Sequence, residues 1–336
     1  MTSHEIFELG NVQLQKGTVL PNAKLAYKTL GTLNKNKDNV IVCPTWVTGY
    51  IDDVIPIFTG EGRPIDPSKY FIIIPALFGM GESSSPSNTP APYEFSRFPH
   101  VTYYDNVGFQ HRLLTEKFGI AQIELVASWS MGGTQSYQWG AQYPDMVKAI
   151  APVACSAKTS IYNKLFLKSL LKAVMSDPNW NKGYYGDVPP VEGMKVFAHI
   201  YAGWGMSEEF YRKEAFHSFG HATLDDFLVD FWEAYFGARD ANNVIAQIWT
   251  WLNGDISAQP LYDGDFGKAL GAIKAKAIVM PAETDQYFPP VDNAAEVALM
   301  KNAEMRVIPS ILGHFAPFNP ADQQFIDAAL SDLLAK

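Results

Sequence analysis

The feature that most constrains the fold of this chain is a series of short apolar runs rich in β-branched residues. They lie at residues 40–43, 70–75, 123–127, 148–154, 277–281 and 305–309. Segments with a helical pattern follow several of them, including 105–119 and 131–142. Buried strands that alternate with helices form a mostly parallel sheet with helices on both faces. The sequence therefore predicts an α/β fold.

A long helical block interrupts this alternation. From about residue 156 to 272 the pattern is helical and rich in Trp, Phe and Tyr, with no strand run. We expect an inserted cap domain at 156–272 and a core domain formed by 1–155 and 273–336. Turn residues between Phe7 and Leu33 indicate a few antiparallel strands. Asp105 is expected to be the N-cap of the helix 105–119.

Composition excludes several classes of function. The formal net charge of −9 and the pI of about 5.3 disfavour binding to phosphate backbones or anionic lipids. Residues 1–10 lack the features of a signal peptide, and no run approaches the ~18 apolar residues of a membrane span. Cys43 and Cys155 have neither metal nor disulfide spacing. We expect a soluble, cytoplasmic protein with two buried free thiols and no nucleic-acid or membrane partner.

The segment from Val126 to Gly133 (VASWSMGG) carries the strongest chemical signal. It lies where a predicted buried strand meets a predicted helix, the place where the G-x-S-x-G nucleophile elbow occurs. Ser128 replaces the first glycine of that pattern, and Gly132 keeps the second. Both are small, as the tight turn requires. Ser130 is therefore the candidate nucleophile, and the alternative is a serine that only caps the helix.

A serine hydroxyl needs a base, and the base needs an orienting carboxylate. In proteins with this elbow the acid and then the histidine follow the serine in the chain. Asp285 follows the run 277–281, and His314 follows the run 305–309. Of the seven histidines, only His314 lies beyond the acid. Asp285 is favoured over Glu283 because it precedes an aromatic-Pro-Pro turn.

An oxyanion site needs two backbone amides close to the nucleophile. We expect the Met131 amide and the Val47 amide to form it, with Trp46 as the neighbouring candidate. Trp46 and Phe315 are also expected to contact substrate. The sequence contains no HExxH motif, no phosphate-binding loop and no GxGxxG that opens a helix, so we expect no metal and no cofactor.

These motifs together resemble the homoserine O-acetyltransferase family of the α/β-hydrolase superfamily, over nearly the whole chain. The resemblance implies an α/β-hydrolase fold, a Ser–Asp–His triad, a helical cap over a tunnel to the serine, and a homodimer formed through the cap. The segments that carry it are 26–34, Thr48-Gly49, 130–133 with Gln135 and Trp139, 238–243, Asp285 with 288–290, and Gly313-His314.

Two departures from that family bear on the substrate. Phe315 stands where the family has an Asp after the histidine, suited to a substrate ammonium group. The segment 199–214 lacks the family's Ala-Arg step, which suits a substrate carboxylate, and Arg212 has different surroundings. Both losses weaken an amino-acid acceptor. Aromatic side chains of the cap suit apolar groups better: Trp204, Phe210, Trp232, Tyr235, Trp249 and Trp251.

The sequence thus favours a carboxylesterase that acts on short acyl esters through an acyl-enzyme on Ser130, similar to the esterase-like members of the family. The first alternative is an O-acyltransferase that uses acetyl-CoA, because the two reactions share every step up to deacylation. The second alternative is a non-catalytic binding protein that kept the fold. Labelling by a serine-directed phosphonate distinguishes it from the other two.

Overall fold

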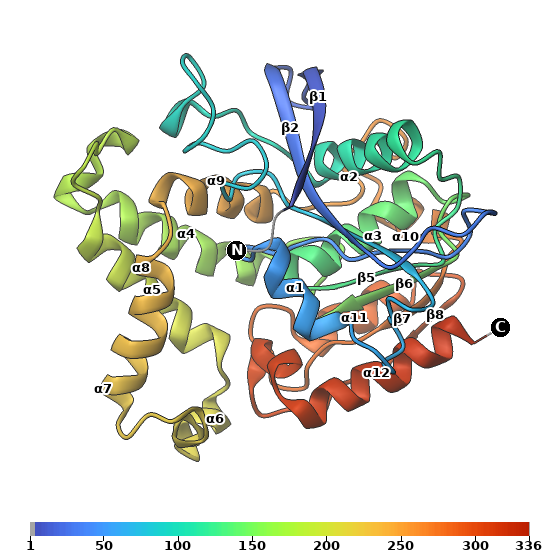
Figure 1. Ribbon diagram of the computed structural model, residues 1–336. Helices are drawn as coiled ribbons and strands as arrows, with labels where there is room; N and C mark the ends of the chain where they lie inside the picture. Colours follow the sequence, from blue (N-terminus) through green and yellow to red (C-terminus); the bar gives the residue numbers. More distant parts are fainter. Residues whose placement is uncertain (1–3, 336) are drawn as a thin grey trace.

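The computed structural model describes residues 4–335 and contains one eight-stranded sheet with the strand order β1-β2-β4-β3-β5-β6-β7-β8 (Figure 1). The first two strands form an antiparallel hairpin, β2 pairs antiparallel with β4, and the remaining pairs are parallel. The strands are β1 Glu5–Gln13, β2 Val19–Leu30, β3 Val40–Val42, β4 Phe71–Pro75, β5 Leu125–Trp129, β6 Ala149–Val153, β7 Lys276–Val279 and β8 Ala303–Met305.

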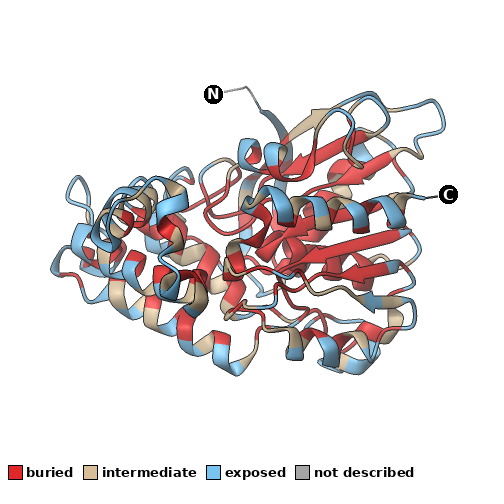
Figure 2. Cartoon of the chain, turned by 90° about the horizontal axis from the view of Figure 1, so that it is seen from below, coloured by how far each residue is buried: buried red, intermediate tan, exposed pale blue. Residues whose placement is uncertain are grey.

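Helices cover both faces of the sheet. The α-helices of the described chain are α1 Ile51–Phe58, α2 Tyr103–Arg112, α3 Ser130–Gln142, α4 Ile161–Met175, α5 Val191–Gly205, α6 Glu208–Arg212, α7 Leu224–Asp226, α8 Ala234–Gly237, α9 Ala241–Leu252, α10 Phe266–Ala272, α11 Pro290–Val297 and α12 Pro320–Leu334. The central strands β3 to β6 are buried along their whole length, as parallel strands covered on both faces must be (Figure 2).

Alternate residues of each strand belong to two different apolar clusters. Ile41 packs with α1 and α12 on one face, whereas Val40 and Val42 pack with α2, α3 and α10 on the other. This follows from the two-residue period of a strand. The cluster on the α1 and α12 face continues without a break into the helices α4 to α9. These helices, here called the cap helices, lie together beside the sheet (Figure 1).

The predicted α/β architecture, a mostly parallel sheet with helices on both faces, is confirmed, including the N-terminal antiparallel strands and the strand–helix alternation. The division into a core at 1–155 and 273–336 and a cap at 156–272 stays a prediction; α10, the last helix of that block, contacts α3. Cys43 and Cys155 are buried free thiols, as expected, and burial raises the pKa of both.

Two local predictions were wrong. Thr102, and not Asp105, is the N-cap of α2, because its hydroxyl accepts from the Asp105 amide while the Asp105 carboxylate accepts from the Thr102 amide. This is a capping box with the acid at its third helical position. The strand expected at 305–309 lies earlier, at Ala303–Met305, and Ile308 adds one bridge to Ala282.

Candidate active site

The sharp turn between β5 and α3 presents Ser130. Its φ is 56°, in the left-handed region that is strained for a residue with a side chain. The two glycines that follow allow close packing at this turn. A Cβ on Gly132 would lie 2.5 Å from the Pro44 carbonyl oxygen, and one on Gly133 would lie 2.6 Å from Sγ of Cys155. The turn thus has the geometry of a nucleophile elbow.

Ser128 occupies the place of the first glycine in the G-x-S-x-G pattern. Its buried hydroxyl donates a hydrogen bond of 2.6 Å to the carbonyl oxygen of Pro44, just after β3. The hydroxyl therefore joins the end of β5 to the loop that follows the neighbouring strand. Because this hydrogen bond gives the buried Ser128 hydroxyl a partner, the elbow accommodates serine at a position where the pattern has glycine.

Ser130, His314 and Asp285 lie in one hydrogen-bonded line. Nε2 of His314 is 2.9 Å from Oγ of Ser130, although the two residues are 184 positions apart in the chain. Nδ1 of His314 is 2.8 Å from Oδ2 of Asp285. All three side chains are buried. With a proton on Nδ1 held by the carboxylate, Nε2 is able to accept the serine proton.

The Asp285 carboxylate is held in place from its other side. Its Oδ1 accepts hydrogen bonds from the backbone amides of Tyr287, at 2.7 Å, and Phe288, at 3.2 Å. Only 3% of the residue is exposed. Glu283, the other acid considered from the sequence, is exposed to solvent. The structure therefore brings Asp285, and not Glu283, against the imidazole.

The loop that carries His314 is fixed by groups that the sequence did not single out. The indole Nε1 of Trp129 donates to the His314 carbonyl oxygen at 2.9 Å, and the two rings lie 4.6 Å apart. Gly313 has a φ of 62°, and a Cβ there would lie 2.8 Å from the carbonyl oxygen of Gly205. Trp129 occupies the unspecified second position of the G-x-S-x-G pattern, so no motif pointed to it.

The predicted oxyanion amides are both available. In the described part of the chain, neither the Val47 amide nor the Met131 amide donates a hydrogen bond to another residue, and the Trp46 amide is also unpaired. Buried amides rarely lack a partner. Met131 also lies at the N-terminus of α3, where the helix dipole favours a negative charge. The hydrogen-bond pattern leaves both Trp46 and Val47 as candidates beside Met131.

An apolar cavity of about 350 Å³ lies beside this line of residues. Trp46, Val47, Trp129 and Phe315 form its wall on the sheet side. That Trp46 and Phe315 contact substrate stays a prediction. The cap helices and α1 complete it. Its aromatic wall suits an apolar ligand. The cap side includes Tyr201, Phe219, Phe231, Trp232, Tyr235 and Phe236, and α1 adds Asp52 and Asp53.

Only some of the cap aromatics considered from the sequence reach the cavity. Trp232 and Tyr235 line it, whereas the other four are packed elsewhere. Phe210 and Trp251 are buried among aromatic neighbours within the apolar cluster. The sequence showed that the cap is rich in aromatic residues. It could not show which of them line the cavity and which belong to the core, because that depends on how the helices pack.

The two arginines of the cap, Arg212 and Arg239, have partners within the protein and do not line the cavity. Arg212 is exposed on α6 and forms ion pairs with Glu208 and Glu209. Arg239 donates from Nε to the Thr48 carbonyl oxygen at 3.3 Å, and it does not line the cavity. Within residues 4–335, no Lys or Arg is among the cavity-lining residues. The cavity thus offers no cationic partner for a substrate carboxylate.

Across the described residues, no group of three or more His, Cys, Asp or Glu side chains is placed to hold a metal ion. The described helices include none that is both long and apolar enough to cross a bilayer.

The chain is similar over most of its length to esterases and to homoserine O-acetyltransferases. Residues 38–320 match a family described as alpha/beta hydrolase fold. A probable esterase of Corynebacterium glutamicum and the ethyl acetate hydrolase of Pseudomonas veronii are each 38% identical to the chain, over 98% of it and 95% of their own length. The homoserine O-acetyltransferase of Nostoc punctiforme is 30% identical over 90% of this chain and 88% of its own.

Solved structures are similar as well. The acetyl esterase MekB superposes with a TM-score of 0.97 at 37% identity, covering 99% of this chain and 97% of that one. An acetylester hydrolase from Corynebacterium glutamicum superposes with a TM-score of 0.95 at 36% identity, covering 99% and 96%. The fold and the chain length are thus shared almost completely.

Proposed function

This chain belongs to the α/β hydrolase fold family and is a carboxylic ester hydrolase, and from that premise we propose that it cleaves small acetate esters through an acyl-enzyme on Ser130. The observation that carries the proposal is the hydrogen-bonded line from Ser130 through His314 to Asp285 beside an apolar cavity. A cavity of about 350 Å³ is near the lower end for ligand sites and fits a small ester.

The proposed reaction has two halves. Oγ of Ser130 bonds to the ester carbonyl carbon while Nε2 of His314 takes the hydroxyl proton. The carbonyl oxygen becomes an oxyanion and is bound by the amides of Met131 and Val47. When this intermediate collapses, the bond to the alcohol oxygen breaks, and the alcohol leaves with the proton from His314.

Water completes the cycle. His314 takes a proton from a water molecule as the water oxygen attacks the acyl carbon. The bond to Oγ of Ser130 then breaks and the serine regains its proton, so that one ester and one water give one acid and one alcohol. Asp285 stays ionised throughout, because its role is to hold the Nδ1 proton and stabilise the imidazolium.

Acyl transfer to an alcohol is the second candidate, because homoserine O-acetyltransferases are 28% to 30% identical to the chain. The same acyl-enzyme serves both reactions. The wall of the cavity within residues 4–335, however, has no Lys or Arg that could bind the carboxylate of an amino acid, although Asp52 and Asp53 line it. Phe315 is apolar, and Arg212 is engaged with carboxylates on the surface of α6. Burying the acceptor's carboxylate without a cationic partner costs roughly several kcal/mol, which disfavours an amino-acid acceptor.

The proposal is tested with p-nitrophenyl acetate and a fluorophosphonate probe on the wild type, Ser130→Ala and Ser136→Ala. Ser136 is a matched control because it is also buried in α3 and its hydroxyl bonds to no described residue. We expect Ser130→Ala to lose about 10⁴-fold or more in rate and all labelling, with Ser136→Ala close to wild type. Full activity of Ser130→Ala would exclude the mechanism.

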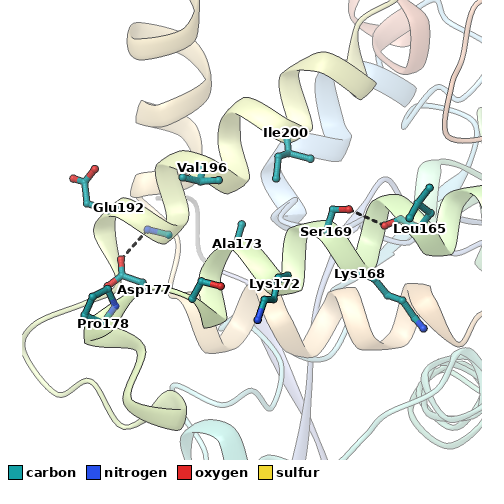
Figure 3. A pocket seen from close by; sticks show the side chains of 12 residues that line it. Leu165, Lys168, Ser169, Lys172, Ala173, Asp177, Pro178, Glu192, Val196 and Ile200 are labelled. Carbon is teal, nitrogen blue, oxygen red and sulfur yellow. Dashed lines mark hydrogen bonds between the residues drawn. The ribbon is translucent and has the colours of Figure 1, made fainter.

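We also propose that the protein is a homodimer formed through the cap. An open groove of about 620 Å³ runs between α4 and α5, and apolar side chains of both helices face it (Figure 3). Leu165 and Val196 are 60% and 52% exposed there. Lys168 and Lys172 line the groove on α4, and Glu192 lines it on α5. Opposite charges on the two helices suit a twofold contact in which α4 of one copy meets α5 of the other.

A further inference from the structure

The loop that carries the Trp46 and Val47 amides is tied to the core at its first end. The carbonyl oxygen of Thr45 accepts a hydrogen bond of 3.0 Å from Nε2 of Gln135, and the same nitrogen lies 3.2 Å from the carbonyl oxygen of Met131. The Thr45 hydroxyl accepts from the Leu77 amide at 2.8 Å. Gln135 is fully buried on α3. One side chain thus links this end of the loop to the helix turn that carries the Met131 amide.

The second end of the loop is tied to the cap. The Thr48 amide donates to Oε1 of Gln247 at 2.7 Å, and Gln247 lies on α9, 199 residues further along the chain. The Thr48 carbonyl oxygen accepts from the hydroxyl of Tyr235, at 3.2 Å, and from Nε of Arg239. The Thr48 hydroxyl lies 3.0 Å from the Tyr235 hydroxyl. The backbone amide and the carbonyl oxygen of Thr48 therefore both form hydrogen bonds with cap residues: Gln247, Tyr235 and Arg239.

This end of the loop needs such support. Thr48 has a φ of 60°, a strained conformation for a β-branched residue, which persists only where the surroundings impose it. Between the two ties, the amides of Trp46 and Val47 remain without a partner among the described residues. The ties therefore set the direction in which these two amides point.

The side chain of Gln247 contains a buried hydrogen-bond donor without a partner in the described part of the chain, which is unfavourable. It is fully buried, and its Nε2 has no partner among the described residues. The amide cannot turn over, because the Thr48 N–H can only donate and so requires the carbonyl oxygen of Gln247. An unpaired buried donor is unfavourable and occurs where another requirement outweighs it. At this position, that requirement is the hydrogen bond to Thr48.

We propose that Gln247 is a positioning residue for hydrolysis, which fixes the Thr48 peptide from the cap so that the Trp46–Val47 amides face the oxyanion formed at Ser130. The inference rests on the proposed function, since it needs that oxyanion. If Gln247 has this role, helix α9 of the cap helps to orient the amides of the oxyanion site. Because Gln247 acts through the loop, its loss affects the transition state more than substrate binding.

The test compares Gln247→Met, which keeps the shape and removes the acceptor, with Thr250→Val as a matched control. Thr250 lies one turn further along α9, is also buried, and donates to the Val101 carbonyl oxygen at 2.7 Å. Each variant removes one buried hydrogen bond of α9, but only the first touches the loop. Gln247→Glu keeps an acceptor at the same place and serves as the rescue variant.

Three quantities are measured: kcat and KM for p-nitrophenyl acetate, the affinity for an aryl trifluoromethyl ketone, and the melting temperature. The ketone adds to a serine hydroxyl and forms an oxyanion without turnover. For Gln247→Met we expect kcat and ketone affinity to fall together by about 10- to 100-fold, with KM within about threefold of wild type. Thr250→Val should lower only the melting temperature, and Gln247→Glu should recover part of the loss in kcat.

The inference is overturned if Gln247→Met changes kcat and ketone affinity no more than Thr250→Val does. It is also overturned if KM carries the whole effect, because the residue would then shape the cavity. Ketone affinity is read without turnover, so it decides the role of Gln247 even if p-nitrophenyl acetate is not hydrolysed. Absence of hydrolysis by the wild type would contradict the proposed function by itself.

Discussion

Phe315 sets the chemical character of the cavity next to the reacting groups. Its ring packs edge-to-face on Trp232 with 5.2 Å between centroids, and lies 5.4 Å from the ring of Trp129. These contacts join the sheet side of the cavity to the cap. Edge-to-face pairs of this kind add to the burial of the rings. A single side chain after His314 therefore decides whether the wall beside the imidazole is apolar or charged.

Replacing this ring tests its role. We expect Phe315→Asp to raise KM for p-nitrophenyl acetate by about tenfold or more, because a carboxylate there lies against Trp129 and Trp232 without a cationic partner. Phe315→Leu, which stays apolar, should raise KM much less. Steady-state kinetics on the two variants gives the comparison. Equal KM values for both would show that the apolar wall does not govern substrate binding.

The junction of β5 and α3 is the element on which the site depends. Ser128 bonds the Pro44 carbonyl oxygen, and the helix starts at once with Ser130, so that Gly132 passes very close to the loop after β3. A Cβ on Gly132 would meet Oγ of Ser128 as well as that carbonyl oxygen, at 2.5 Å. Because backbone cannot move aside as a side-chain end can, this contact is rigid.

The expected consequence is a large loss of stability in Gly132→Ala, about 3 kcal/mol or more, together with loss of activity. Adding Ser128→Gly should not restore it, because the Pro44 carbonyl oxygen remains. Gly203→Ala on α5 is the control, since a Cβ there meets nothing within 4 Å, and it should be neutral or slightly stabilising. Urea denaturation measures all three. Recovery in the double variant would contradict this account of the elbow.

The elements that carry the site were predictable from local patterns. Ser130, Asp285 and His314 each follow a strand of the sheet, of which β8, before His314, is only partly buried, and strand ends on one edge of a parallel sheet come together by topology. The Thr102 cap was missed because a capping box depends on two reciprocal hydrogen bonds, and Asp105 alone is also a plausible cap. The bond between Thr48 and Gln247 had no sequence signal, because it depends on how the cap helices pack on the sheet.

At the scale of the whole molecule, a buried acid makes stability depend on pH. Glu296 is 4% exposed, and burial raises its pKa from 4.5 to about 7. Its Oε1 accepts from the Ala157 amide and its Oε2 from Nδ2 of Asn293, which partly offset the burial. Because the unfolded chain loses this proton near pH 4.5 and the folded chain near pH 7, the stabilising effect of the protonated form is lost as pH rises between them.

Glu296→Gln tests this dependence. For the wild type we expect the free energy of unfolding to fall as pH rises from about 5 to about 7, with about 3 kcal/mol of the fall due to this group at most. The glutamine variant should show a smaller fall over the same interval. Urea denaturation at several pH values measures both slopes. Identical slopes would mean that Glu296 does not titrate in this window.

Assembly through the cap is the other property of the whole molecule that the surface suggests. We expect wild-type protein to be a dimer at micromolar concentration in light scattering, and Leu165→Asp to be a monomer, because a carboxylate in the groove between α4 and α5 opposes apolar burial. Val291→Asp, on α11 and 72% exposed, is the control and should remain dimeric. A monomeric wild-type protein would contradict the proposed homodimer.

The fate of the acyl group tests the central claim most directly. The purified protein and Ser130→Ala are given p-nitrophenyl acetate or acetyl-CoA in water that contains homoserine, and free acetate and O-acetylhomoserine are quantified by mass spectrometry. The account predicts that the wild type forms mainly free acetate from the ester, that Ser130→Ala does not, and that little O-acetylhomoserine appears. Dominant, Ser130-dependent formation of O-acetylhomoserine would contradict it and identify a transferase.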